Sequence, residues 1–380
     1  MNATPQILDA AGRVPLPLTA FERKVAAATS TGAIAKRQAE LAAKQALPLA
    51  EKIELSMRLI RDWYEAWDGM VSVSYSGGKD STVLLWLVRS MYPDVPAVFS
   101  HTGLEYPEVV RHVLNTPNHV ILRPKMHFSR VIKEYGWPLA SKKIARGVEL
   151  IRHPTENNAN VRRLYLEGIN RYGRPVNGFR IAQRWRFLFD AQFECSDRCC
   201  GIMKKEPAAR YERETGRKPF VGTMTSDSKA RQRTYLLNGG CNAFDMVHPR
   251  SAPLSFWTEQ DVLRCISENN IRIPSVYGDI VTEQEQVRLS GLGQYNLPHL
   301  STTGVRRTGC VFCCFGLHMD EGQHNRFEQL AVTHPKMHRY VMDKLGLREV
   351  LEYCKAHSVP ALSKKFRWEC PEESRAVAAG

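Results

Sequence analysis

The stretch Ser74-Tyr75-Ser76-Gly77-Gly78-Lys79-Asp80-Ser81 decides the fold of this 380-residue chain. The alternating segment at residues 70–75 predicts a buried strand, and the apolar run at residues 82–88 predicts a helix packed on a sheet. The two glycines let the backbone approach an anion closely, and the first amides of a helix point toward it. Two serine hydroxyls and the Lys79 ammonium add further donors. The stretch therefore predicts a phosphate-binding loop.

The loop differs in spacing from two common phosphate-binding motifs. A Walker A loop has four residues between its first glycine and Gly-Lys, and the dinucleotide turn reads G-x-G-x-x-G. The loop instead resembles the SGGxDS loop of the ATP pyrophosphatase (PP-loop) superfamily. That resemblance implies a site for ATP with Mg²⁺ or for an adenylyl sulfate, and cleavage of ATP between its α and β phosphates.

The expected nucleotide-binding residues lie in this loop and in later strand–helix turns. They are Ser74, Ser76, Gly77, Gly78, Lys79, Asp80, Ser81, Thr102, Gly103, Ser226 and Arg231. Of these, Lys79, Asp80 and Ser81 are the expected catalytic residues, with Asp80 near the Mg²⁺ and Lys79 offsetting charge on the leaving group.

The rest of the chain alternates between strand and helix patterns. Strands are predicted at residues 95–100, 120–122 and 220–223, and helices at residues 51–67 and 258–268. The alternation predicts a three-layer α/β fold with a parallel sheet, in which ligands bind at the carboxyl ends of the strands.

Three consecutive parts are expected along the chain. Residues 1–50 predict a helical or partly ordered arm, residues 51–300 the nucleotide-binding domain, and residues 301–380 a cysteine-bearing helical region. Within the domain, residues 141–180 mix Pro, Asn and Gly with basic residues and predict an irregular loop or lid. Helices are predicted in the tail near residues 324–331, 335–343 and 346–356.

Composition favours a polyanionic partner and a cytoplasmic location. The first twenty residues lack the apolar core of a secretory signal, and no apolar stretch approaches the length of a membrane span. The formal net charge is +14, which favours nucleic acid or a multiply phosphorylated nucleotide over a neutral ligand.

Much of this charge is concentrated in one segment. Residues 141–186 hold eleven Lys and Arg against three Glu, with four aromatic residues interleaved. Such a mixture suits a surface that tracks a nucleic-acid backbone and stacks on its bases. It equally suits a deep pocket for a bis-phosphorylated nucleotide. We expect DNA or tRNA to be bound here, through Lys142, Lys143, Arg146, Arg162 and Arg163.

Clustered cysteines indicate metal or redox chemistry. The chain has ten cysteines, which include the pair Cys199-Cys200 and the C-x-x-C of Cys310 and Cys313. Four thiolates complete the ligand set of a 4Fe–4S cluster or of a structural zinc ion. Cys241 is an alternate ligand, and Cys265 is at an apolar position of a predicted helix and is expected in the core.

Combined with the PP-loop, these cysteines resemble the iron–sulfur branch of the phosphoadenosine phosphosulfate (PAPS) and adenosine phosphosulfate reductase family. The resemblance runs from about residue 55 to 357 and implies that the cluster is 4Fe–4S. The tail, with Thr308 to Gly316 and Asn325-Arg326-Phe327, is similar to PAPS reductase-like proteins of phages and mobile elements.

The resemblance breaks near the C-terminus. A sulfonucleotide reductase needs a nucleophilic cysteine there, and the family motif is Glu-Cys-Gly followed by His. Here Glu369-Cys370 is followed by Pro371 and two glutamates, which would raise the pKa of the thiol. Cys370 is therefore a poor candidate for reductase chemistry.

The leading hypothesis is an ATP-using iron–sulfur enzyme that activates a nucleic acid for sulfur insertion, as in DNA phosphorothioation or tRNA thiolation. A sulfur-donor protein and a second copy of the chain are its expected partners, and a membrane is not. The alternatives are a PAPS or adenosine phosphosulfate reductase that releases sulfite, and a non-catalytic nucleotide-sensing, DNA-binding module.

Overall fold

The computed structural model describes residues 31–369, apart from residues 239, 245, 290–292 and 321–324. These residues form two compact units. We call residues 31–124 with 204–309 the sheet unit, and residues 125–203 with 310–369 the cysteine unit. Both units are discontinuous in sequence, whereas the sequence analysis divided the chain into three consecutive parts. Residues 125–203 group with the C-terminal region, and α2 (Thr31–Ala46) belongs to the sheet unit.

The sheet unit is built on a mostly parallel six-stranded sheet with the order β3-β2-β1-β5-β7-β6. All its neighbouring strands run parallel except β6 and β7. The strands are β1 (Val71–Ser74), β2 (Ala97–Ser100), β3 (His119–Leu122), β5 (Lys218–Val221), β6 (Asn242–Ala243) and β7 (Arg250–Ser251). The predicted α/β class is confirmed. The strand predicted at residues 220–223 begins two residues earlier, at Lys218.

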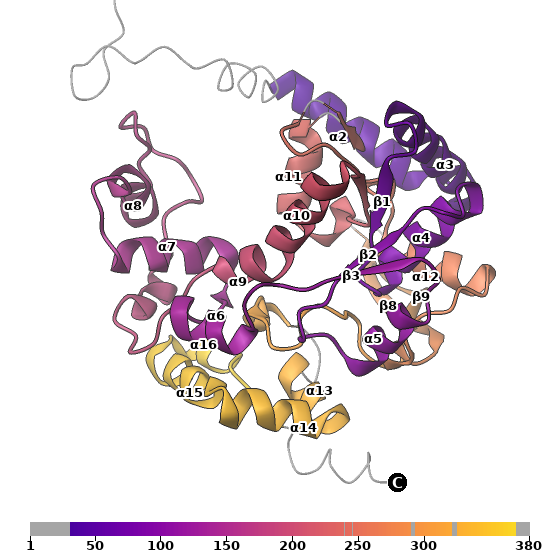
Figure 1. Cartoon of the computed structure of the whole chain (residues 1–380). Helices are drawn as coiled ribbons and strands as arrows, with labels where there is room; N and C mark the ends of the chain where they lie inside the picture. Colours follow the sequence, from indigo (N-terminus) through magenta and orange to yellow (C-terminus); the bar gives the residue numbers. More distant parts are fainter. Residues whose placement is uncertain (1–30, 239, 245, 290–292, 321–324, 370–380) are drawn as a thin grey trace, which may run out of the picture. The chain divides into compact units, whose positions relative to one another are not determined.

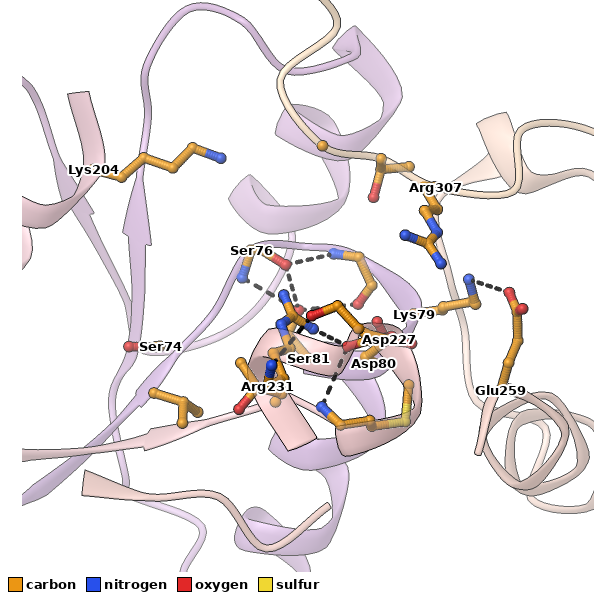
Figure 2. Close-up of a pocket in the computed structure, with 18 of the residues that line it drawn as sticks. Ser74, Ser76, Lys79, Asp80, Ser81, Lys204, Asp227, Arg231, Glu259 and Arg307 are labelled. Atoms are coloured by element: carbon orange, nitrogen blue, oxygen red, sulfur yellow. Dashed lines mark hydrogen bonds and ion pairs between the residues drawn. The ribbon is translucent and has the colours of Figure 1, made fainter. Parts of the chain in front are cut away.

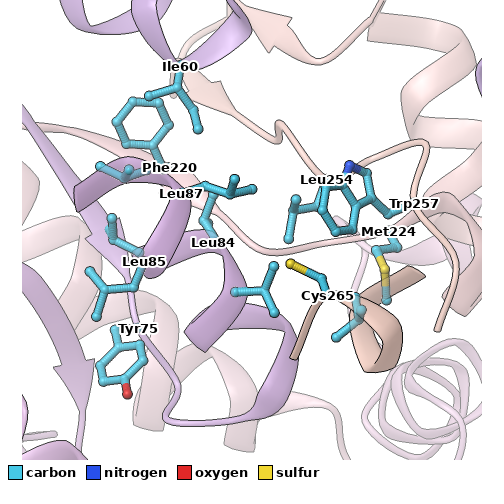
Figure 3. Close-up of a cluster of buried hydrophobic side chains, with 14 of the residues drawn as sticks. Ile60, Tyr75, Leu84, Leu85, Leu87, Phe220, Met224, Leu254, Trp257 and Cys265 are labelled. Carbon is cyan, nitrogen blue, oxygen red and sulfur yellow. The ribbon is translucent and has the colours of Figure 1, made fainter. Parts of the chain in front are cut away.

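Helices accompany this sheet in the sheet unit, and most of them contribute buried apolar side chains to its core (Figure 1). They are α2, α3 (Leu49–Ala66), α4 (Lys79–Met91), α5 (Pro107–Leu114), α10 (Glu206–Thr215), α11 (Lys229–Asn238) and α12 (Glu259–Glu268). Leu84 and Leu87 of α4 pack with Phe220 of β5 and Trp257 in a fully buried core (Figure 3). Cys265 is fully buried in the same core, as predicted.

An antiparallel hairpin was not predicted. It pairs β8 (Ile280–Leu289) with β9 (Gly293–Thr302) over ten residue pairs. The first strand carries four Glu and Gln residues, so it lacks the apolar alternation by which strands are recognised.

The cysteine unit is mainly helical. Its helices are α6 (Phe128–Tyr135), α7 (Lys142–Arg152), α8 (Ala159–Glu167), α9 (Arg198–Cys200), α13 (Arg326–Thr333), α14 (Pro335–Arg339), α15 (Leu347–His357) and α16 (Pro360–Ser363). A short parallel pair joins β4 (Leu139–Ala140) to β10 (Cys314–Phe315). The helices predicted for the tail are present, within a few residues of the expected limits.

The prediction of an irregular segment at residues 141–180 was wrong for α7 and α8. Ser141 caps α7 by accepting a hydrogen bond from the Ile144 amide at 3.2 Å. Ala145 and Val148 are fully buried on the apolar face. The many basic residues of the segment hid this short apolar stripe. In the described part of the chain, no helix combines the length and apolar character that a membrane span requires.

Candidate functional site

The loop between β1 and α4 is held by hydroxyl groups. The Ser81 hydroxyl donates to the Gly78 carbonyl at 3.0 Å and accepts a hydrogen bond from the Ser76 amide at 3.2 Å. The two serine hydroxyls lie 2.9 Å apart. Because each hydroxyl has one proton, the Ser76 hydroxyl donates to Ser81 in this network. The loop is therefore shaped by its own side chains.

Steric contacts explain both glycines of the loop. Gly77 has a φ of +69°, and a Cβ there would lie 2.7 Å from Cγ2 of Val113 and 2.8 Å from Cγ1 of Val109 on α5. A Cβ at Gly78 would lie 2.9 Å from Oγ1 of Thr308. Helix α5 and the segment before the C-x-x-C thus close on the loop from two directions, and only glycine fits between them.

A cavity of about 590 Å³ lies over the loop, at the carboxyl ends of β1 and β5 (Figure 2). This is a volume typical of small-ligand sites. The charged side chains that line it are four cations and three acids, namely Lys79, Lys204, Arg231, Arg307, Asp80, Asp227 and Glu259. The cations and the first amides of α4 suit a ligand with several phosphates.

Lys79 is held on the side of the cavity that faces α12. Its ammonium lies 2.9 Å from Oε1 of Glu259 and donates to the Arg306 carbonyl at 2.7 Å, and its side chain is only 6% exposed. Burial opposes ionisation of Glu259, but the charge and hydrogen bond of Lys79 lower the pKa of Glu259 overall, helped by Arg306 and Arg307. Glu259 therefore remains a carboxylate that neutralises Lys79, and a phosphate group must compete with it.

A buried tyrosine accepts a hydrogen bond from the first backbone amide of α4. The Tyr277 hydroxyl accepts a hydrogen bond from the Lys79 amide at 3.1 Å and lies 2.7 Å from Oγ1 of Thr308. The Lys79 ammonium is 5.5 Å from the centre of the Tyr277 ring. Burial raises the pKa of the Tyr277 phenol, which stays neutral. Tyr277 thereby ties the loop to residues about 200 positions away in the sequence.

Asp80 presents a carboxylate oxygen without a protein partner. Its Oδ1 is buried and has no hydrogen-bond partner in the described part of the chain. Burial raises the pKa of Asp80, although the charge of Lys79 opposes this shift. An orphaned carboxylate oxygen beside a phosphate loop fits a hard cation such as Mg²⁺.

The structure gathers some of the predicted nucleotide residues and separates others. Those that line the cavity are Ser74, Ser76, Gly78, Lys79, Asp80, Ser81 and Arg231. Gly77, Thr102, Gly103 and Ser226 are not in its lining. Thr102 is buried and its hydroxyl is 2.6 Å from Oε1 of Glu105, so it stabilises its own turn. The Ser226 hydroxyl donates to the Trp257 carbonyl at 3.0 Å.

Sequence reasoning missed Tyr277, Glu259, Arg307 and Thr308. Only Arg307 and Thr308 offered a signal, because they stand three and two residues before the C-x-x-C. Tyr277 and Glu259 reach the loop through tertiary packing alone.

The four predicted metal ligands all belong to the cysteine unit. Cys199 and Cys200 lie on α9, and Cys310 and Cys313 bracket a turn closed by a backbone hydrogen bond of 3.1 Å. Burial raises the pKa of Cys313 to about 11, and the charges of Cys310 and Cys200 add to this shift. Among the described residues, no three metal-ligating side chains already converge on one point.

The thiol donor set fits a soft metal centre, either a 4Fe–4S cluster or zinc. Arg326 supports the cysteine turn, since its guanidinium donates to the carbonyls of Cys313 and Phe315 at 3.1 Å and pairs with Asp320 at 2.6 Å. The alternate ligand Cys241 is instead buried in the core of the sheet unit, where burial raises the pKa of its thiol.

The predicted nucleic-acid residues lie on two helices of the cysteine unit that pack together. Lys142, Lys143, Arg146 and Arg163 are exposed and Arg162 is half-buried, on α7 and α8. A Cβ at Gly147 would lie 2.6 Å from Tyr165, so the helices approach closely there. The expectation for the aromatics was wrong in part: Tyr165 and Trp185 are buried and offer no stacking face, whereas Tyr172 and Phe179 are half-buried.

Comparison with known proteins identifies the family. The model of the phosphoadenosine phosphosulfate reductase domain matches residues 70–144 and 152–314, which is more than half of the chain. The chain belongs to this family. The match spans the PP-loop, Cys199-Cys200 and the C-x-x-C, and it confirms the resemblance to the PAPS reductase family.

Curated relatives match this chain over smaller parts of its length. An uncharacterized protein of Methanocaldococcus jannaschii is 37% identical over 84 residues, covering 21% of this chain and 18% of the relative. The sulfate adenylyltransferase subunit 2 of Shewanella loihica is 27% identical over 238 residues, covering 58% of this chain and 64% of the relative. The matched part is thus less than two thirds of each of these relatives.

Among solved structures, the PAPS reductase of Candida auris in a phosphate complex is similar to this chain. It shares 16% sequence identity at a TM-score of 0.33, and the match covers 58% of this chain and 82% of that chain.

Proposed function

We propose that this PAPS reductase family member is an enzyme of the sulfonucleotide type that binds ATP or an adenylyl nucleotide over the Ser76–Ser81 loop. The observation that carries the proposal is the single cavity in which the loop, four cationic side chains and the orphaned Asp80 carboxylate meet. Similarity to sulfate adenylyltransferase subunit 2 supports ATP as the nucleotide and adenylyl transfer as the reaction.

In this reaction an acceptor atom forms a bond to the α-phosphorus. The bond from that phosphorus to the bridging oxygen breaks, and pyrophosphate leaves with the electron pair. The positive end of the α4 dipole and the hydroxyls of Ser76 and Ser81 hold the pyrophosphate. Lys79, once released by Glu259, offsets its charge. A Mg²⁺ ion held by Asp80 would neutralise phosphate charge when bound.

The finer proposal names a nucleic acid as the acceptor and sulfur insertion as the outcome. It is supported by the exposed basic residues of α7 and α8, whose charge exceeds what a single nucleotide needs. Cys199, Cys200, Cys310 and Cys313 would hold a 4Fe–4S cluster, which supplies sulfur or electron chemistry when bound. A sulfur-donor protein would complete the system.

The reductase reading is the second candidate, because the matching family model is that of a reductase domain. It requires a reactive Cys370, which lies outside the described residues, as does the acidic sequence that follows it.

The decisive experiment uses anaerobically purified protein with Mg²⁺. Incubation with ATP and DNA, tRNA or sulfate should release pyrophosphate, and AMP should become attached to the acceptor or be freed. Incubation with PAPS and a dithiol should release no sulfite. Sulfite without pyrophosphate would establish the reductase reading instead. Nucleotide binding with neither product would indicate a sensing module.

A further inference from the structure

One wall of the cavity is formed by a turn and a helix that bury few apolar side chains. The 3₁₀ turn η3 (Thr225–Asp227) and helix α11 supply three lining residues, Asp227, Ser228 and Arg231. Arg231 pairs with Asp227, and Ser228 caps the helix by accepting from the Arg231 amide at 3.2 Å. Leu236 is the one buried residue among the described side chains of α11. A helix with so few apolar contacts is expected to open readily on its own.

Helix α2 braces this wall at both ends. Near the middle of α2, Nη1 of Arg37 donates to the Leu236 carbonyl at 2.6 Å, in the last turn of α11. Near the end of α2, Nε2 of Gln45 donates to Oγ1 of Thr225 at 3.2 Å, in the turn before α11. Between these two residues, Leu41 is 1% exposed and belongs to the core of the sheet unit. Figure 1 shows α2 lying beside α11.

The chemistry of the two hydrogen bonds made by Arg37 and Gln45 suits a role in holding α11 in place. The last carbonyls of a helix have no partner within the helix and carry partial negative charge, so the Arg37 guanidinium is a favourable partner for one of them. Thr225 is itself fixed, because its hydroxyl donates to the Ser255 carbonyl at 2.8 Å. The two hydrogen bonds bracket Asp227, Ser228 and Arg231 along the chain.

We propose that α2 is a positioning element of the nucleotide site, and that Arg37 and Gln45 hold Arg231 where it contacts the phosphates of the ligand. The inference rests on the proposed nucleotide site. It assigns a role in binding to a segment expected from sequence to be a separate arm, and it makes the affinity for a polyphosphate depend on residues that do not line the cavity.

The test combines Arg37→Ala with Gln45→Ala and measures ATP binding by calorimetry on the full chain. The pair should weaken ATP binding by about tenfold, from one charged and one neutral hydrogen bond. In an Arg231→Ala background the same pair should weaken binding by less than about twofold, because the residue it positions is gone. Gln38→Ala, an exposed glutamine on the same helix, should bind like the parent.

Hydrogen exchange gives a readout that needs no nucleotide. The paired variant should exchange faster over residues 228–237, with no change over α4. Equal weakening in the parent and Arg231→Ala backgrounds, or unchanged exchange over α11, would overturn the inference. If exchange changes as expected but the parent does not bind ATP, the proposed nucleotide site fails while the brace itself stands.

Discussion

The two units differ in how far their candidate sites are prepared for a ligand. In the sheet unit, the Ser76–Ser81 loop is closed by its own hydroxyls and tied down by Tyr277. In the cysteine unit, Cys199 and Cys200 share α9 and Cys310 and Cys313 bracket one turn, but no three metal-ligating side chains converge within the described residues.

This difference follows from chemistry. A phosphate loop is made of backbone amides and dipoles, which folding orients without a ligand. A thiolate site needs like charges to gather, so the metal contributes to its assembly and displaces protons from the thiols. Burial, with a smaller contribution from the charges of Cys310 and Cys200, raises the pKa of Cys313, so this thiol must give up a proton when it binds a metal.

The Gly78→Val variant tests most directly whether the loop of the sheet unit is already shaped for phosphate. If the loop is prepared for phosphate, a side chain here collides with Thr308 and Tyr277 and blocks approach of the ligand. We expect ATP affinity to fall by about a hundredfold or more, measured by calorimetry. Gly32→Val, at a site with no atom within 4 Å of the added Cβ, should leave ATP binding intact. Parent-like binding by Gly78→Val would place the nucleotide elsewhere.

The cysteine unit is tested by Cys310→Ser. Anaerobic parent protein should be brown and contain about four iron and four sulfide per chain, and the variant should lose both. Iron and acid-labile sulfide assays measure this, and a thermal melt should show that the cysteine unit loses stability along with its cluster. Cys265→Ala removes a core cysteine of the sheet unit and should keep the metal. Stoichiometric zinc without sulfide in the parent would contradict the cluster.

A smaller effect is expected on α7. Lys142→Ala with Arg146→Ala removes two exposed charges and should weaken binding to short DNA or tRNA about tenfold at low salt, by fluorescence anisotropy. The slope of log affinity against log salt should flatten by about 1.4 to 1.8, since each lost phosphate contact removes about 0.7 to 0.9.

The matched control for α7 is Arg58→Ala with Arg61→Ala, which removes two exposed charges from α3. If both pairs act alike, only net charge matters and the α7–α8 surface has no special role. If the parent binds no oligonucleotide at low salt, the nucleic-acid acceptor is excluded.

Local sequence was enough to predict the strand–loop–helix unit, because Ser76 and Ser81 shape the loop through contacts within a few residues. It could not reveal Tyr277 or Glu259, whose roles depend on segments about 180 to 200 positions from the loop. Thr102 shows how a local position can be right while the contacts of its side chain stay hidden. Its place after a strand was correct, but Glu105 occupies its hydroxyl. The irregular structure predicted for residues 141–180 was wrong for α7 and α8, because the many basic residues there hide the apolar stripe of α7.

The smallest expected effect concerns Asp80→Asn. Burial raises the pKa of Asp80 in the folded chain, so the folded state keeps this proton to higher pH than the unfolded state does. Stability is therefore lost as pH rises from the ordinary Asp range through the raised pKa. The Asp80→Asn variant has no carboxyl group to ionise at this position, so it does not lose this stability. Without Mg²⁺, we expect the variant to melt about 2 to 4 °C higher than the parent at pH 7, and the difference to vanish near pH 3. A lower melting temperature at pH 7 would mean that Lys79, Arg231 and Arg307 already neutralise the charge of the Asp80 carboxylate. Asp80 would then not require a bound cation.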